Sequence, residues 1–158
     1  MEPAESTQIP IVTSEADKHR WTAALMAFDY CDPTPLSALI ESDAIPLEIR
    51  GIIASIIIGN RKPNKRAAAK SKVPPNERFQ IGATIGGLLE VIADMKHPVI
   101  TENYADKKGV EPKDAIIHLN KMIDDVYNRA VVKLAISRET VENLVREWRK
   151  KRREWPNV

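Results

Sequence analysis

The sequence predicts an all-α fold of six to seven helices, and three observations carry this prediction. Apolar residues recur every three to four positions through most of the chain, which is the spacing of an amphipathic helix. Several of these periodic stretches begin at residues that favour helix starts, such as Ser14, Pro46 and Ser137. The 158 residues are 43% hydrophobic, so the chain can bury a core and wholesale disorder is excluded.

The composition also excludes several classes of protein. The longest apolar run, residues 51–59, is about half the length that a membrane span requires. The first residues, Met1–Pro10, lack the basic region followed by an apolar region that marks a signal peptide. The single cysteine, Cys31, excludes an intrachain disulfide and a multi-cysteine zinc site, and it fits a reducing cytoplasm. We therefore expect a cytoplasmic protein that does not interact with a membrane.

Charge and proline content divide the chain into four segments. Residues 1–13 contain two prolines and no periodic pattern, so we interpret them as a flexible tail. Residues 14–59 carry seven acidic and three basic side chains and are predicted to form an acidic helical subdomain. Residues 60–76 carry six basic and no acidic side chains and are interpreted as a basic linker. Residues 77–158 are predicted to form a second helical subdomain.

The acidic subdomain begins with two predicted helices. Ser14 opens a capping box, and apolar residues at helical spacing behind it predict a helix over residues 15–29 (Trp21, Ala24, Leu25 and Phe28). Thr34 as the N-cap and Pro35 as the first helical residue predict a short helix over residues 35–41.

The next two helices are predicted from isoleucines and glycines. Residues 46–59 begin at a proline, end at Gly59 and carry one apolar face of Ile49, Ile52, Ile53, Ile56 and Ile57. These isoleucines would also suit a strand, but their spacing and the flanking residues favour a helix. Residues 77–96 are predicted to form a helix in which Gly82 and Gly86 make a flat stripe that another helix can approach closely.

The last third of the chain has the most regular pattern. A short helix is predicted over residues 101–108, followed by a turn at Gly109. Apolar residues then keep a helical period through residues 112–134, which leaves open whether this stretch is one helix or two. Ser137 is a favourable N-cap for a final helix that extends to about Glu154.

Two stretches of this region resemble the helix-turn-helix of DNA-binding proteins. In residues 103–116, Ala105, Gly109 and Val110 match the small residue, the turn glycine and the apolar residue of that family. The resemblance implies a recognition helix that would expose Lys113, Asp114, His118 and Lys121. This mixture of charges is poor chemistry for an anionic groove.

The second stretch, residues 130–149, resembles the turn and reading helix of phage and mobile-element regulators. The matching positions are Ile136, Ser137, Thr140 and Val141. Two positions depart from the pattern, because Val131 stands where the family prefers alanine and Ala135 where it prefers glycine. The resemblance implies an all-α fold with a C-terminal helix-turn-helix-like segment that reads DNA.

The final helix carries most of the residues that we predict to contact DNA. One side is apolar, with Val141, Leu144, Val145 and Trp148, and the opposite side is basic. Arginine, lysine and asparagine contact phosphates and base edges. The predicted contacts are Arg138, Asn143, Arg146, Arg149, Lys150 and Arg153. The same pattern also fits a solvated helix that is stabilised by the pairs Glu142–Arg146 and Glu147–Lys151.

The basic segment over residues 60–80 is a second candidate for phosphate contact. The predicted contacts are Arg61, Lys62, Lys65 and Arg66, with Lys70 and Lys72 able to neutralise further phosphates. No aromatic residue lies within residues 60–78, so base stacking on single strands is not supported. Two other interpretations stay open, a solubilising linker or a segment that pairs with the acidic N-terminal half.

Residues that could carry catalysis are sparse. His19, His97 and His118 are far apart and share no metal-ligand spacing with Cys31. No glycine-rich phosphate loop and no nucleophile elbow occurs in the sequence. We therefore expect no enzymatic activity, no metal and no cofactor.

These patterns lead to two functional hypotheses. The first is a non-enzymatic protein that binds duplex DNA through residues 138–154 and the 60–80 segment. The alternative is a helical adaptor or assembly subunit that binds a protein partner through apolar faces and the acidic N-terminal half. A homo-oligomer is compatible with either hypothesis.

Overall fold

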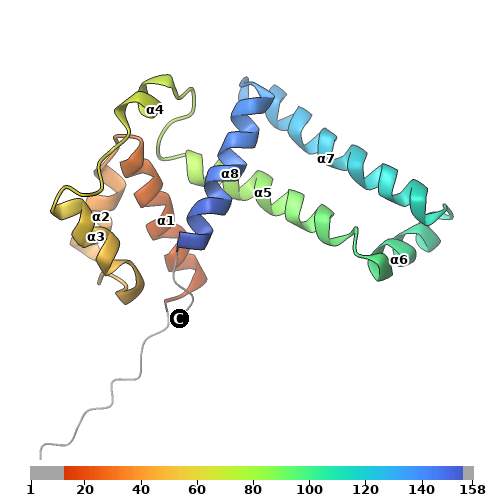
Figure 1. The fold of residues 1–158 in the computed structure, drawn as a ribbon, viewed down its shortest axis with the longest axis horizontal. Helices are drawn as coiled ribbons and strands as arrows, with labels where there is room; N and C mark the ends of the chain where they lie inside the picture. The colour runs from red at the N-terminus through yellow and green to blue at the C-terminus, as the bar shows by residue number, and fades with distance from the viewer. Residues whose placement is uncertain (1–12, 155–158) are drawn as a thin grey trace, which may run out of the picture.

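The computed structural model describes residues 13–154 of the chain, and this part is all-α (Figure 1). Within it lie eight α-helices and one 3-10 turn, η1, with no strand. The all-α prediction is confirmed, but the described residues contain one helix more than the upper end of the predicted range of six to seven. The predicted tail, residues 1–13, lies outside the described residues except for Thr13. The helices are α1 (Glu15–Asp29), α2 (Thr34–Ser42), α3 (Arg50–Ile57), α4 (Lys65–Lys70), α5 (Arg78–Asp94), α6 (Pro98–Lys108), α7 (Pro112–Leu134) and α8 (Arg138–Glu154).

The additional helix is α4, which lies inside the predicted basic linker. Asn64 caps its N-terminus, because the Asn64 Oδ1 accepts a hydrogen bond of 3.0 Å from the Ala67 N–H. Three consecutive alanines, residues 67–69, favour the helix through their high intrinsic propensity. The basic segment is therefore partly helical.

The helices α1, α2 and α3 pack around a shared apolar cluster. Its buried members are Trp21, Ala24, Leu25, Leu36, Ile49 and Ile53. The predicted helix over residues 46–59 forms as η1 (Leu47–Ile49) followed by α3, and the strand alternative is excluded. Ile57, which we placed on the apolar face, is 77% exposed because it is the last residue of α3, at the edge of that face.

The start of α2 differs from the prediction. Thr34 was expected to be the N-cap, but the cap position is occupied by Pro33 and Thr34 is already helical. The N-cap makes no side-chain hydrogen bond, and the Thr34 N–H instead donates to the Oδ1 of Asp32, two residues earlier, at 3.1 Å.

A second apolar cluster joins α5, α7 and α8. Its buried members include Ile85, Leu89, Ala130, Ile136, Val141, Leu144 and Val145. The glycine stripe of α5 lies directly against α8, as predicted: a Cβ at Gly82 would lie 2.7 Å from the Leu144 carbonyl oxygen, and one at Gly86 would overlap the Trp148 ring. Residues 112–134 form one continuous helix, which settles that open question. The helix α6 begins at Pro98, three residues before the predicted start.

The turn between α7 and α8 is sharp. Ala135 has φ +52°, the left-handed conformation that glycine would adopt at lower cost. Ile136 is buried, and the Ser137 Oγ accepts a hydrogen bond of 3.2 Å from the Thr140 N–H. The predicted N-cap of the last helix is thus confirmed, and α8 begins at Arg138.

A small third cluster connects the two larger ones. Met26 of α1, Phe79 of α5 and Trp148 of α8 are buried against one another.

The helices α1 to α4 lie at one end of the molecule, while α5 and α7 extend to the other end, where α6 joins them (Figure 1). Among the described helices, none has both the length and the apolar character needed to cross a membrane.

Candidate nucleic-acid interface

The structure brings together two basic segments that are far apart in the sequence. The segment that contains α4 lies beside α8, and two hollows of about 340 Å³ and about 260 Å³ lie between them. Tyr30, Ala67 and Glu147 line both hollows, so the hollows adjoin. We call this surface the basic groove and define it by five of the cations that line it: Lys62, Lys70, Lys72, Arg146 and Lys150.

One end of the α4 segment is fastened at Asp29, the last residue of α1. The Arg61 Nε and Nη2 donate to its two carboxylate oxygens at 3.0 and 2.7 Å, and the Lys151 Nζ lies 2.8 Å away. The Asn64 N–H donates to the Asp29 carbonyl at 2.8 Å. Burial raises the pKa of Asp29, but the hydrogen bonds and charges of Arg61 and Lys151 outweigh it and hold that pKa below its ordinary value.

The other end of the segment is fastened at Arg78, the first residue of α5. Its buried guanidinium donates to the Ser71 Oγ at 2.7 Å, to the Tyr30 hydroxyl at 2.9 Å and to the Glu147 Oε2 at 2.7 Å. The Tyr30 hydroxyl in turn donates to the other Glu147 oxygen, and the guanidinium lies 3.7 Å from the Tyr30 ring centroid. Burial, and then the hydrogen bond to Glu147, raise the pKa of Tyr30 to about 12.

These two clusters give the basic groove a fixed shape. Asp29 of α1 and Arg78 of α5 hold the α4 segment at Arg61 and at Ser71, on either side of the helix. Two side chains of α8, Lys151 and Glu147, pair with Asp29 and Arg78 in turn. The lysines between and beside these points are therefore presented in a defined position next to α8. A preformed surface loses less conformational entropy on binding than a flexible arm.

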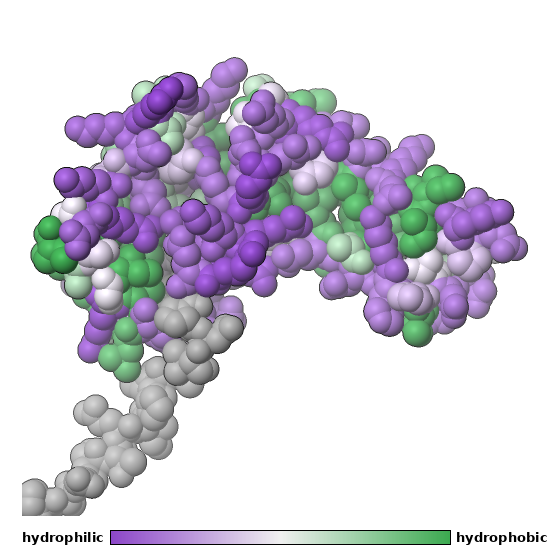
Figure 2. All heavy atoms as spheres, in the orientation of Figure 1, coloured by the Kyte–Doolittle hydropathy of each residue, from purple (hydrophilic) through white to green (hydrophobic). Residues whose placement is uncertain are grey.

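The cations of the basic groove are free of internal ion pairs. In residues 13–154, no carboxylate lies within 4.0 Å of the Nζ of Lys62, Lys70, Lys72 or Lys150, or of the Arg146 guanidinium. Figure 2 shows hydrophilic side chains gathered over α4 and α8 on this face of the molecule. The groove therefore presents uncompensated positive charge, which an anionic partner can neutralise.

The structure separates the predicted contact residues into three groups. Asn143, Arg146, Lys150 and Lys62 line the groove, and four others lie outside its lining without an ion pair in the described part of the chain: Lys65, Arg66, Arg149 and Arg153. Arg61 is committed to Asp29.

Arg138 is also occupied inside the protein. It pairs with Asp124 at 2.8 Å and with Glu142 at 3.1 Å, and its guanidinium lies 4.9 Å from the Tyr127 ring centroid. Together with Arg61 it holds the fold rather than facing the groove, and we leave both out of the proposed contact surface.

The helix-stabilising pairs of the alternative interpretation do not form. Glu142 pairs with Arg138 instead of Arg146, and Glu147 pairs with Arg78. Lys151 reaches Asp29 and Glu154. Arg146, on the basic side of α8, therefore has no ion pair with Glu142, the carboxylate four positions before it.

Sequence reasoning missed the residues that support the groove. Tyr30, Ser71 and Arg78 come from three different elements, and none belongs to a recognisable motif. A basic residue in the first turn of a predicted amphipathic helix, as Arg78 is, gives no indication of burial. Only the packing of α5 on α8 places it beneath the surface.

The first helix-turn-helix-like stretch, between α6 and α7, lies at the other end of the molecule (Figure 1). Ala105 is buried and Gly109 has φ +66°, which gives the sharp turn that its glycine suggested. The exposed residues of α7 include Lys113, Asp114, His118 and Lys121, so positive and negative charges alternate on this surface.

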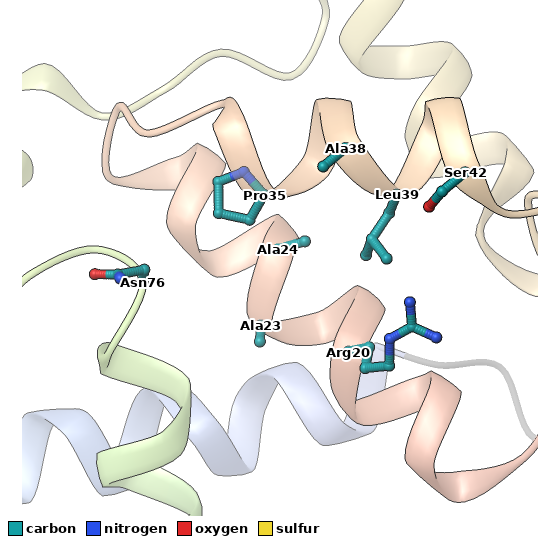
Figure 3. Close-up of a pocket in the computed structure, with 8 residues that line it drawn as sticks. All are labelled: Arg20, Ala23, Ala24, Pro35, Ala38, Leu39, Ser42 and Asn76. Carbon is teal, nitrogen blue, oxygen red and sulfur yellow. The ribbon is translucent and has the colours of Figure 1, made fainter.

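A third hollow, of about 410 Å³, lies between α1 and α2 (Figure 3). Small apolar residues line most of it, including Ala23, Ala24, Pro35 and Ala38. Its one charged lining residue, Arg20, is paired with Asp17 and Asp43. The lining contains no histidine, cysteine or carboxylate, and its other polar side chains are Ser42 and Asn76.

Residues 13–154 contain no group of three side chains that could hold a metal ion. His19, His97 and His118 are exposed, and so is Cys31. Comparison with known protein families, with curated proteins and with solved structures finds no match for this chain. The basic groove is therefore the feature on which a functional proposal can be built.

Proposed function

We propose that this protein binds duplex DNA without catalysing a reaction, and that the basic groove contacts the phosphate backbone. The observation that carries the proposal is the juxtaposition of the α4 segment and α8 around cations that have no ion pair in the described residues. Each such cation that meets a phosphate releases condensed counterions, and this release drives association with DNA.

The helix-turn-helix-like segment adds a reading element to this proposal. The helix α8 follows α7 after a three-residue turn, and its exposed side carries Arg146, Lys150 and Arg153 together with half-buried Asn143. Side chains of these types reach both phosphates and base edges. We propose that α8 faces the DNA and that Lys62, Lys70 and Lys72 position it on the backbone.

The test is fluorescence anisotropy of a labelled duplex of random sequence, titrated at about 50 mM and about 200 mM salt. The triple variant Lys62→Gln, Arg146→Gln and Lys150→Gln removes three exposed cations of the groove. We expect the plot of log affinity against log salt to lose roughly one unit of slope for each residue, so roughly three in all.

The matched control carries the same charge change at the far end of the molecule. The triple variant Lys107→Gln, Lys113→Gln and Lys121→Gln lies on α6 and α7, at exposed positions. It should leave the salt slope close to that of the wild type. If the salt slope falls in the control and stays unchanged in the groove variant, the DNA contacts lie on α6 and α7 instead of in the groove. No binding at the lower salt concentration would overturn the proposal.

A second candidate function, a helical adaptor or assembly subunit, is supported by aliphatic side chains around α3. Leu47, Ile57 and Ile58 are 65%, 77% and 69% exposed. Docking of a protein on these residues would depend on apolar burial and would be nearly insensitive to salt. Sedimentation of the chain at both salt concentrations tests this function for self-association. A larger species that persists at high salt and is lost in Ile57→Ser/Ile58→Ser would support it, and a monomer under all conditions would count against self-assembly.

A further inference from the structure

The larger hollow of the basic groove has the features of a site for one anionic group. It has a volume of about 340 Å³ and lies between the end of α4 and the first half of α8. Lys70 and Lys72 line it from the α4 side, and Asn143 and Arg146 line it from α8. Three hydroxyl-bearing side chains, Tyr30, Ser71 and Thr140, also belong to its lining.

A buried charged side chain supports this hollow. Arg78 is 5% exposed and lines the hollow, while its two terminal nitrogens are engaged with Ser71, Tyr30 and Glu147. Its Nε is buried and has no hydrogen-bond partner within the described residues. The positive charge beneath the hollow is therefore held in place by packing and hydrogen bonds, and one of its donors is unused.

The one carboxylate of the lining does not oppose an anion. The Glu147 Oε1 accepts from the Tyr30 hydroxyl, and its Oε2 accepts from Arg78, which balances its charge. Lys70, Lys72 and Arg146 then remain as three positive charges without an ion pair in residues 13–154. The hollow thus favours an anion with several acceptor oxygens, and a phosphate group has this chemistry.

We propose that this hollow binds a single phosphate group, with Lys70, Lys72 and Arg146 supplying the charge and Thr140 and Asn143 supplying neutral donors. The phosphate can belong to the backbone of DNA or to a free phosphorylated ligand, and only the DNA source rests on the proposed function. The rest of the groove, with Lys62 and Lys150, is the smaller hollow that adjoins this one.

The test is a titration of the isotope-labelled protein with inorganic phosphate at constant ionic strength, followed by the amide resonances of Ser71, Thr140 and Asn143. We expect saturable shifts at these residues. In the variant Lys70→Gln/Lys72→Gln the apparent dissociation constant should rise by roughly tenfold or more. Both lysines are exposed, so the fold should be retained, and Arg146→Gln provides an independent variant.

The matched control is Lys107→Gln/Lys108→Gln, which removes two adjacent exposed lysines at the end of α6. It should bind phosphate as the wild type does. Shifts that rise linearly without saturation, or that weaken equally in the control, would overturn the site.

A competition experiment separates this inference from the proposed function. If saturating phosphate weakens duplex binding at constant ionic strength, the hollow holds a backbone phosphate. If phosphate binds with saturation and duplex DNA does not bind at all, the proposed function fails and the hollow stands as a site for a free phosphorylated ligand. If duplex DNA binds and phosphate does not, the single-phosphate site is wrong.

Discussion

Arg78 at the start of α5 and Glu147 within α8 form an ion pair with an N–O distance of 2.7 Å across 69 positions of sequence. The Arg78 side chain is 6% exposed and the Glu147 side chain 30%. Through Tyr30 and Ser71 the same pair also reaches the end of α1 and the α4 segment. A single polar cluster thus connects four parts of the fold directly beneath the basic groove.

Replacement of Arg78 by alanine should destabilise the protein strongly. It leaves the Glu147 carboxylate without its cation and removes the hydrogen bond to Ser71. We expect a loss of roughly 3 kcal/mol in the free energy of unfolding, at the lower end of the range for buried pairs, because Glu147 is 30% exposed. Urea unfolding followed by circular dichroism measures this loss. Arg50→Ala, at an exposed arginine, should change the free energy by less than about 0.5 kcal/mol. Equal losses in the two variants would contradict the assigned role.

The glycine stripe of α5 provides a second prediction, with a control one residue away. A Cβ at Gly86 would overlap the Trp148 ring, whereas a Cβ at Gly87 would meet no atom within 4 Å. Gly86→Ala should therefore lower the free energy of unfolding by roughly 1–3 kcal/mol. Gly87→Ala should raise it by roughly 0.5–1 kcal/mol, because alanine is the better helix former. Thermal and urea unfolding of both variants measure these two opposite changes in stability. Two changes of the same sign would show that the Trp148 ring does not pack closely against Gly86.

Much of the fold could be predicted because its determinants are local. The spacing of Gly82 and Gly86 indicated a close helix contact, and Ser137 marked the start of α8. The helix α4 was missed because it is only six residues long and has no buried residue of its own, so apolar periodicity cannot detect it. Short helices of this kind depend on caps and on tertiary contacts such as the one between Arg61 and Asp29.

The candidate site could be predicted only in part. The basic character of Arg146 and Lys150 is visible in the sequence, and so is that of Lys62. Their adjacency is not, because it depends on a chain reversal through α5, α6 and α7 that no local pattern specifies. The same holds for Arg61 and Arg138, whose partners Asp29 and Asp124 lie 32 and 14 positions away. Local sequence patterns identify the charged side chains, but only the fold determines which of these side chains form ion pairs and which do not.

Ala135 should be a site where glycine stabilises the protein. Its φ of +52° is a conformation that costs an L-residue roughly 1 kcal/mol. We expect Ala135→Gly to raise the free energy of unfolding by up to about that amount. Ala54→Gly, at an exposed position inside α3, should instead lower it by roughly 0.5–1 kcal/mol. Urea unfolding of the two variants distinguishes them. A loss of stability in both would mean that the turn before α8 is not left-handed in solution.

The ion pairs of Asp29 should make stability depend on acid pH. Because the pKa of Asp29 is lower in the folded chain than its ordinary value, its contribution is present at neutral pH and is lost as the pH falls through the lowered pKa. Asp29→Asn should therefore cost roughly 1–3 kcal/mol at about pH 7. The difference from the wild type should shrink below about pH 4, where the carboxylate takes up a proton.

Unfolding in urea at several pH values from about pH 7 to below about pH 4 checks the Asp29 prediction, and Asp125→Asn is the control. Asp125 is an exposed carboxylate of α7 without an ion pair in residues 13–154, so its replacement should shift stability by less than about 0.5 kcal/mol at every pH. A difference between wild type and Asp29→Asn that stays constant from neutral to acid pH would mean that the cost comes from packing rather than from charge. The ion pairs of Asp29 with Arg61 and Lys151 would then not be the interactions that hold the α4 segment in place beside α8.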